Sequence, residues 1–216
     1  MVREIDNTQD MKDLAIKNKK NKDSYHHGDL RESMIKMGAK LLAEDGTEKF
    51  SLRKLATMCN VSHAAPYKHF KNKEELIEAI KEYIDKEFAD TLKEVSEKYK
   101  DNPLKKITEL GKRYVSFMVE NKDYLKLLFF NSNNYNIKVN INNIENYNYE
   151  PFRIFKDSAV EALKFTNADP AEYGRSIMAM WATVHGLAVM ISNSTIVYDG
   201  DYLDLVEQIL MSNVKF

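Results

Sequence analysis

The fold is decided by residues 51–70, which read SLRKLATMCNVSHAAPYKHF. Ser51 can cap a helix with its hydroxyl, and it is followed by apolar residues at helical spacing, namely Leu52, Leu55 and Ala56. After an interruption at 59–61, Ser62 can cap a second helix of two turns over residues 63–70. Two short helices joined by a tight turn predict a helix-turn-helix.

Helical spacing of apolar residues continues on both sides of this segment. Upstream, it predicts a helix over residues 29–44 that Gly46 can end in a left-handed conformation. Downstream, Asn72 and Glu75 resemble a capping box that opens a helix over residues 73–99. Further helices are expected over residues 103–120, 122–130, 150–166, 170–192 and 201–213.

The composition supports an all-α protein. Gly and Pro together number 11 of 216 residues, which leaves few turn-formers for many short strands. Residues 131–148 hold nine Asn and are expected to form an irregular loop. We divide the chain into a mobile basic arm at 1–24, an N-terminal three-helix helix-turn-helix domain at 25–73, and a helical domain at 74–216, which the long helix joins to it.

Charge is distributed unevenly along the chain, although the formal net charge is only -1. Residues 12–73 hold 14 Lys or Arg against 7 Asp or Glu, whereas residues 74–216 hold 17 against 23. A basic first third indicates that this end binds a polyanion, for which a phosphate backbone is the commonest candidate. The alternative is a solvated surface with uneven charge.

Several classes of protein are disfavoured by what the sequence lacks. Its single cysteine, Cys59, allows no intrachain disulfide, and the Cys and His residues are not spaced as metal ligands. No apolar stretch has signal-peptide length, and the uncharged segment 176–198 is too polar for a membrane span. No nucleophile with a base, carboxylate pair or phosphate-binding Gly loop occurs at usable spacing. We expect a cytoplasmic protein that is not an enzyme and needs no cofactor.

The segment Leu30–Leu76 resembles the DNA-binding region of the tetracycline-repressor (TetR) family of bacterial one-component regulators. Residues 39–77 read AKLLAEDGTEKFSLRKLATMCNVSHAAPYKHFKNKEELI and follow the family's order of helix, Gly turn, short helix, Val-Ser turn and recognition helix ending in Tyr-x-x-Phe. Pro66 departs from the small or hydroxyl residue that many members place before the Tyr. It lacks an N–H for the first intrahelical bond, and it could alter which bases the helix reads.

The rest of the chain is similar to the family by its number of helices and by three residues of the expected helix 170–192. Trp181, His185 and Gly186 resemble the "WHG" signature of one subgroup's C-terminal domain. The resemblance implies a homodimer that places two recognition helices on a pseudopalindromic operator in double-stranded DNA.

The chemistry of the helix-turn-helix residues fits DNA binding. Hydroxyl, imidazole and cationic groups at helix starts suit phosphate contacts, for which the candidates are Ser51, Arg53, Tyr67, His69 and Lys73. The candidate base-reading residues head the recognition helix and are Ser62, His63, Ala64 and Ala65, of which His63 is the best reader. Phe70 is expected in the core, and Tyr67 could also be a core aromatic.

Two groups of residues in the second domain are assigned to a ligand pocket and a dimer interface. Aromatic rings and methionines suit an apolar pocket, formed by Tyr114, Phe117, Met118, Phe152, Trp181 and His185. The simpler interpretation is core packing, with Trp181 and His185 as a structural pair on one helix face. Apolar stripes on the last two helices predict an interface of Ile177, Met180, Val184, Leu187, Ile191, Val206, Ile209 and Leu210.

We therefore expect a transcriptional repressor that leaves its operator when a small apolar or aromatic effector binds. The alternative is a DNA-binding architectural or interaction protein that no ligand gates. The two differ in whether any small molecule changes the affinity for DNA.

Overall fold

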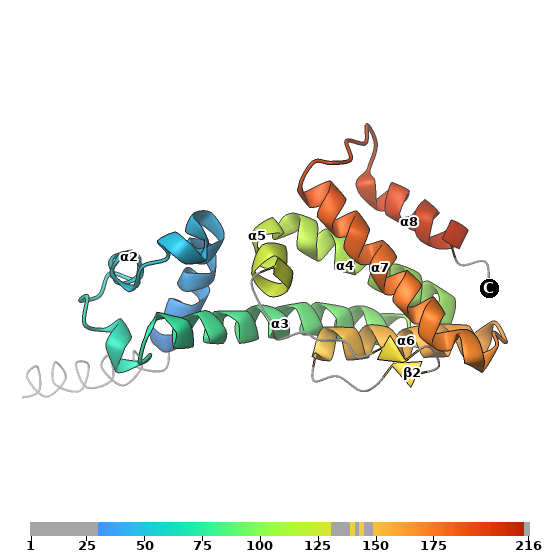
Figure 1. Cartoon of the computed structure of the whole chain (residues 1–216), viewed down its shortest axis with the longest axis horizontal. Coiled ribbons are helices and arrows are strands. Elements are labelled where there is room, and N and C mark those ends of the chain that lie inside the picture. Colours follow the sequence, from blue (N-terminus) through green and yellow to red (C-terminus); the bar gives the residue numbers. More distant parts are fainter. Residues whose placement is uncertain (1–29, 131–138, 141–142, 145–148, 214–216) are drawn as a thin grey trace, which may run out of the picture. The chain divides into compact units, whose positions relative to one another are not determined.

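The computed structural model in Figure 1 describes residues 30–130, 139–140, 143–144 and 149–213. The described chain is α-helical except for one pair of two-residue strands, so the expected all-α class is confirmed. It divides into two compact units, Met1–Ile80 and Lys81–Phe216, whereas the expected boundary followed residue 73. The expected basic arm at 1–24 lies outside the described residues.

The first unit is a small helical cluster. It contains a helix over residues 30–49, helix α2 (Leu52–Met58) and the first turns of helix α3 (Lys73–Lys98). Its most deeply buried side chains are at most 1% exposed and include Met34, Leu41, Leu55, Phe70 and Leu76. The first helix approaches α3 closely, because a Cβ on Gly38 would lie 2.8 Å from Cδ1 of Ile80.

Gly46 adopts the expected left-handed conformation, with φ of +72°. Helical hydrogen bonding nevertheless continues past the expected end at residue 44, to residue 49. A further bond follows, in which the N–H of Phe50 donates to the carbonyl of Gly46 at 3.1 Å. The glycine therefore bends the chain toward α2 without leaving its backbone groups unpaired.

Helix α2 ends in a Schellman motif, which explains the expected interruption after Met58. Asn60 has φ of +54°, and its N–H donates to the carbonyl of Thr57 at 3.0 Å. The N–H of Val61 donates to the carbonyl of Ala56, also at 3.0 Å. These two bonds satisfy carbonyls at the helix end, and Asn is one of the few residues that tolerates the left-handed region.

The recognition segment is shorter than expected. In place of a two-turn helix over 63–70, only Pro66–Lys68 forms a helix, and it is a single 3-10 turn. The N–H of Ala65 donates at 2.9 Å to the carbonyl of Ser62, three residues earlier, which is the hydrogen-bond spacing of a 3-10 helix. Pro66 has no N–H, so it cannot donate the α-helical hydrogen bond to the carbonyl of Ser62, four residues earlier. A 3-10 turn forms instead.

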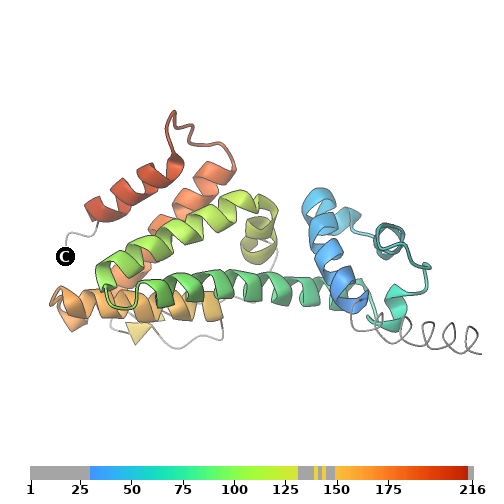
Figure 2. The same ribbon diagram turned by 180° about the vertical axis from the view of Figure 1, so that it is seen from behind.

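The second unit is built around helix α4 (Pro103–Glu120), which packs mainly against three later helices of the chain; Figures 1 and 2 show it among them. These partners are α6 (Glu150–Phe165), α7 (Tyr173–Ser192) and α8 (Tyr202–Asn213). Helix α4 has the expected bounds, and its cap Asn102 accepts the N–H of Lys105 at 3.1 Å. The central packing is close: a Cβ on Gly111 would lie 2.6 Å from Cδ1 of Leu210.

Three expected elements of this unit differ in detail. The helix expected over 122–130 is α5 (Lys122–Leu125) followed by a π-helical turn, Lys126–Phe130. The helix expected over 170–192 begins with a 3-10 turn at Pro170–Glu172 before α7. Most of the expected loop at 131–148 lies outside the described residues, but two of its parts pair as antiparallel strands, β1 (Val139–Asn140) and β2 (Asn143–Ile144). Backbone pairing therefore replaces the irregular loop at those positions.

No helix in the described ranges combines the length and apolar character that a membrane span requires.

Candidate nucleic-acid interface and aromatic cluster

The candidate DNA contacts lie on the surface of the first unit. Arg53, Ser62, His63, Ala64 and Tyr67 are exposed, and Ser51, Ala65, His69 and Lys73 are partly exposed. Tyr67 is 58% exposed, which excludes the core alternative for its ring, whereas Phe70 is 1% exposed and belongs to the core as expected. The guanidinium carbon of Arg31 lies 5.1 Å from the centroid of the Phe70 ring.

Ser51 is the N-cap of α2, as expected, but its side chain makes no capping hydrogen bond. Its backbone is extended, with φ of -132° and ψ of 126°, and the first turn of α2 contains no acidic residue. Such a helix start presents N–H groups and a hydroxyl to an anion. Lys54, on the same turn, is already paired with Asp45, since its Nζ lies 2.8 Å from Oδ2.

Lys73 begins helix α3, as expected, and the residues around it form a modified capping box. Oδ1 of Asn72 accepts the N–H of Glu75 at 2.8 Å. Oε2 of Glu75 in turn accepts the N–H of Lys71 at 2.7 Å, one residue before the position that a capping box uses. These bonds fix the turn between the 3-10 segment and α3, and they hold Lys73 at a defined place at the helix start.

All candidate pocket residues of the second unit except Met118 belong to one aromatic cluster. The Tyr114 ring centroid lies 5.0 Å from that of Trp181, and Trp181 lies 4.9 Å from Phe152. Five of the six candidates are at most 6% exposed: Tyr114, Phe117, Met118, Phe152 and Trp181. Most rings meet edge to face, a favourable arrangement for aromatic pairs. Such mutual packing agrees with the core interpretation of these residues.

His185 is the polar member of the cluster and is only partly buried. The hydroxyl of Tyr114 lies 2.8 Å from its Nδ1. Burial lowers the pKa of His185, and burial also raises the pKa of Tyr114, so that both groups are neutral at pH 7. The pair therefore connects α4 to α7 without a charge.

Three further rings belong to the cluster but were not among the candidate pocket residues. Phe88 lies 4.8 Å from Phe117, Phe129 lies 4.8 Å from His185, and Phe155 lies 5.2 Å from Trp181. For Phe155 the signal in the sequence is its position three residues after Phe152 on one helix face. Phe129 lies in the π-helical turn, whose register helical spacing does not predict.

The structure divides the eight candidate interface residues into two groups. Most are buried within their own chain, at 7% exposed or less, namely Ile177, Val184, Leu187, Val206 and Leu210. Met180, Ile191 and Ile209 are partly exposed. The buried five pack within their own chain and offer little surface to a second subunit, so the interface at these positions stays a prediction.

A different face of α7 remains open. Ala179 and Ala182 are exposed, Gly186 is partly exposed, and a Cβ on Gly186 would meet nothing within 4 Å. Within the described part of the chain, no neighbouring backbone therefore requires a glycine at position 186. Residues 176–192 carry no Asp, Glu, Lys or Arg, so this exposed face has no charged side chain.

Metal ligands are not grouped in the described part of the chain: it contains no set of three or more His, Cys, Asp or Glu residues that could hold an ion.

Comparison with known proteins connects the first unit to a family of regulators. Residues 35–80 match the family model for bacterial regulatory proteins of the tetR family. A curated relative, the uncharacterized HTH-type transcriptional regulator YerO of Bacillus subtilis (strain 168), is 29% identical over 100 residues. That alignment covers 45% of this chain and 34% of the relative, so the chain spans about a third of the length of that protein.

Solved structures share the fold over most of the chain. A protein of unknown function from Rhodococcus sp. RHA1 is 25% identical, with a TM-score of 0.69 over 88% of this chain and 95% of that one. The transcriptional regulator FadR from Bacillus subtilis, in complex with stearoyl-CoA, is 13% identical, with a TM-score of 0.62 over 85% and 97%. AibR, in complex with isovaleryl coenzyme A and operator DNA, is 15% identical, with a TM-score of 0.57 over 84% and 96%. These likenesses show a shared fold, and the family match over residues 35–80 makes the first unit similar to bacterial regulatory proteins of the tetR family.

Proposed function

We propose that this chain is a dimeric TetR-type repressor that leaves its operator when a small apolar or aromatic ligand binds its second unit. The observation that supports DNA binding most strongly is the helix-turn-helix of residues 51–70, which exposes His63 and Tyr67 beside two helix starts. The family match covers this same segment. In this role His63 reads a base edge, while Arg53 and Lys73 contact phosphates.

The aromatic cluster of the second unit supports an apolar effector. Two proteins of similar fold are bound to acyl-coenzyme A compounds, stearoyl-CoA in one and isovaleryl coenzyme A in the other. We therefore place acyl-CoA thioesters first among the ligands to be tested. In this proposal the rings around Trp181 contact the acyl chain, and His185 supplies the polar contact.

Dimerisation is proposed through the open face of α7 rather than through the five buried candidate interface residues. Ala179, Ala182 and Gly186 are small, and helix backbones approach closely where such residues meet. The lack of charge along this face removes the desolvation cost that would oppose burial. A two-fold axis at this face would place the recognition segments of two subunits on a pseudopalindromic operator.

A mobility-shift assay tests the DNA-binding part of the proposal. Wild-type protein is titrated against DNA from its own upstream region and against the same DNA scrambled, at physiological salt. The repressor proposal expects a preference of at least a thousandfold for the natural sequence. Equal affinity for both would remove sequence specificity.

The ligand part is tested on the same complex. An acyl-CoA series of increasing chain length is added, with free coenzyme A as the control. A ligand acts as an effector only if it prefers the DNA-incompetent state. A compound that raises the thermal midpoint but changes operator affinity by less than twofold, about 0.4 kcal/mol, contradicts induction by that compound. If no compound in a wider metabolite screen changes affinity, the architectural alternative is favoured.

A further inference from the structure

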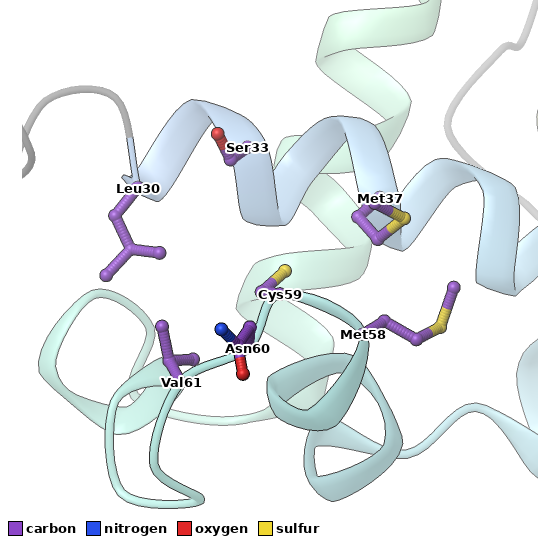
Figure 3. Close-up of a pocket in the computed structure, with 7 residues that line it drawn as sticks. All are labelled: Leu30, Ser33, Met37, Met58, Cys59, Asn60 and Val61. Atoms are coloured by element: carbon purple, nitrogen blue, oxygen red, sulfur yellow. The ribbon is translucent and has the colours of Figure 1, made fainter.

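A groove in the first unit has no part in the function proposed above. Its volume is about 480 Å³. It lies between the first helix, which supplies Leu30, Ser33 and Met37, and the end of α2 with the turn that follows, which supply Met58, Cys59, Asn60 and Val61. In Figure 3 these two sets face one another, and the thiol of Cys59 points toward the first helix.

The walls of the groove suit an aromatic side chain with a polar end. Four apolar or thioether side chains are partly exposed there, those of Leu30, Met37, Met58 and Val61. Methionine adapts its shape and makes favourable contacts with aromatic rings. Ser33 and Asn60 add a hydroxyl and an amide, either of which can hydrogen-bond a phenol. Burial of an aromatic ring would remove these apolar surfaces from water.

We propose that the groove is occupied by the chain's own segment 24–29, with the ring of Tyr25 as its anchor. Leu30, which lines the groove, is joined directly to this segment. Tyr25 is the only Phe, Tyr or Trp among residues 1–29. The five residues from Tyr25 to Leu30 span at most about 17 Å when extended, so the ring reaches the groove without strain on the tether.

A tethered occupant has an advantage over a free molecule. Short flexible linkers give effective concentrations in the millimolar range, which is above the level of most free metabolites. Gly28 lies between Tyr25 and Leu30 and can adopt either sign of φ, so the chain can fold back at this position. These two properties favour the chain's own segment over a small molecule as the occupant.

Docking has a local consequence for the helix-turn-helix. Val61 lines the groove and directly precedes Ser62, the first candidate base-reading residue. A ring packed against Val61 supports the turn from which that residue projects. It also fixes the point at which the lysine-rich stretch 17–22 leaves the domain.

Cys59 provides a reporter without background, because it is the only cysteine in the chain. The rate at which Ellman's reagent modifies the full-length protein is measured at one fixed pH for wild type and variants. Tyr25→Ala is expected to raise the modification rate of Cys59 by threefold or more. Tyr25→Phe keeps the ring and should raise this rate by less than threefold. Tyr198→Ala removes an exposed tyrosine of the second unit and serves as the matched control. A rise of less than threefold for Tyr25→Ala overturns the proposal.

A second measurement separates docking from loosened folding. A disulfide requires two Cα atoms within about 7 Å, so Ser24→Cys, which keeps the Tyr25 ring, should cross-link to Cys59 when diamide accepts the two electrons and two protons of the thiol pair. Ser24→Cys combined with Tyr25→Ala has the same tether without the ring and is the control. Cross-linking of Ser24→Cys at least three times faster than the double variant supports docking, and a smaller ratio overturns it. A free small molecule in the groove would leave the wild type and Tyr25→Ala equal in Cys59 reactivity, which also overturns it.

Discussion

The Tyr114 hydroxyl lies 2.8 Å from Nδ1 of His185, so the two side chains share a hydrogen bond that joins α4 to α7. Burial raises the pKa of Tyr114, so the phenol keeps its proton. A protonated phenol can donate to the imidazole or accept from it, and we expect it to donate, so that the neutral ring holds its hydrogen on Nε2. The cluster would then present a single N–H donor at a ring that is only partly buried, beside the π-helical Phe129.

Removal of this hydroxyl should cost stability and change the imidazole. Tyr114→Phe leaves Nδ1 of His185 without its hydrogen-bond partner, and a buried group that loses its partner costs about 1–3 kcal/mol. Denaturant unfolding measures the loss, and the nitrogen chemical shifts of His185 report whether the Nε2–H tautomer persists. Tyr198→Phe, at a tyrosine that is 45% exposed, should change neither quantity. A Tyr114→Phe variant as stable as wild type would contradict this assignment.

Stability should fall in mildly acidic solution because of His185. Burial lowers its pKa in the folded protein below the ordinary value of 6.5. As pH falls through 6.5, the unfolded chain takes up a proton at this position while the folded chain does not, so the free energy of unfolding decreases toward the lowered pKa. The free energy of unfolding is measured at pH 7.5 and at pH 5.5 for wild type and for His185→Gln. It should decrease less in His185→Gln than in wild type. An equal decrease in both proteins would exclude His185 as the cause.

The two kinds of DNA contact should respond differently to truncation. Lys73→Ala should weaken binding to every sequence and lower the slope of log affinity against log salt by about 1, because one phosphate contact is lost. His63→Ala should mainly change which operator bases are preferred. Lys100→Ala, an exposed lysine in the second unit, is the control for net charge. A salt slope that Lys73→Ala leaves unchanged would remove this residue from the interface.

Subunit association can be tested without damage to the core. Ala182→Glu adds a charge to the open face of α7, where the side chain is exposed, so the monomer should keep its helix content. Sedimentation should then show monomers, since burial of an unpaired carboxylate opposes association. Ala171→Glu adds the same charge at an exposed position before α7 and should remain dimeric. A dimeric Ala182→Glu protein would place the interface elsewhere.

Close packing at Gly111 should be visible in a double-mutant cycle. Gly111→Val introduces a Cβ that would lie 2.6 Å from Cδ1 of Leu210 and 3.2 Å from Cγ1 of Val184, and such overpacking costs about 1–3 kcal/mol. Leu210→Ala removes the nearer atom at a cost of about 2–5 kcal/mol. Because the second change relieves the first, the double variant should lose less stability than the sum of the two. Strict additivity in urea unfolding would contradict direct contact.

Helix positions could be predicted where local signals are strong. The bounds of α4 agree with the expected 103–120, because Asn102 caps the helix and Pro103 is compatible with its first turn. The start of α3 at Lys73 was likewise marked by Asn72 and Glu75. Such signals act within a few residues, and the sequence contains them in full.

One expectation is wrong for a physical reason. The missing N–H of Pro66 favours a 3-10 turn over the two-turn helix expected at residues 63–70. On α7, apolar residues occupy both faces, so periodicity alone does not tell the face that packs on its own chain from the open one, and the dimer interface stays a prediction. The contact between Tyr114 and His185 joins residues 71 positions apart, and no local pattern encodes it.

Under the proposed function, the single 3-10 turn at Pro66–Lys68 limits how much sequence information one subunit can read from DNA. A reading element of one turn presents fewer side chains to base edges than a longer helix does, so each half-site must be short. Short sequences recur by chance throughout a genome. Under the proposed function, discrimination among these sites must then come from the spacing between two half-sites and from the deformability of the DNA between them. This regulator should therefore tolerate a changed base within a half-site better than an inserted base pair between the half-sites.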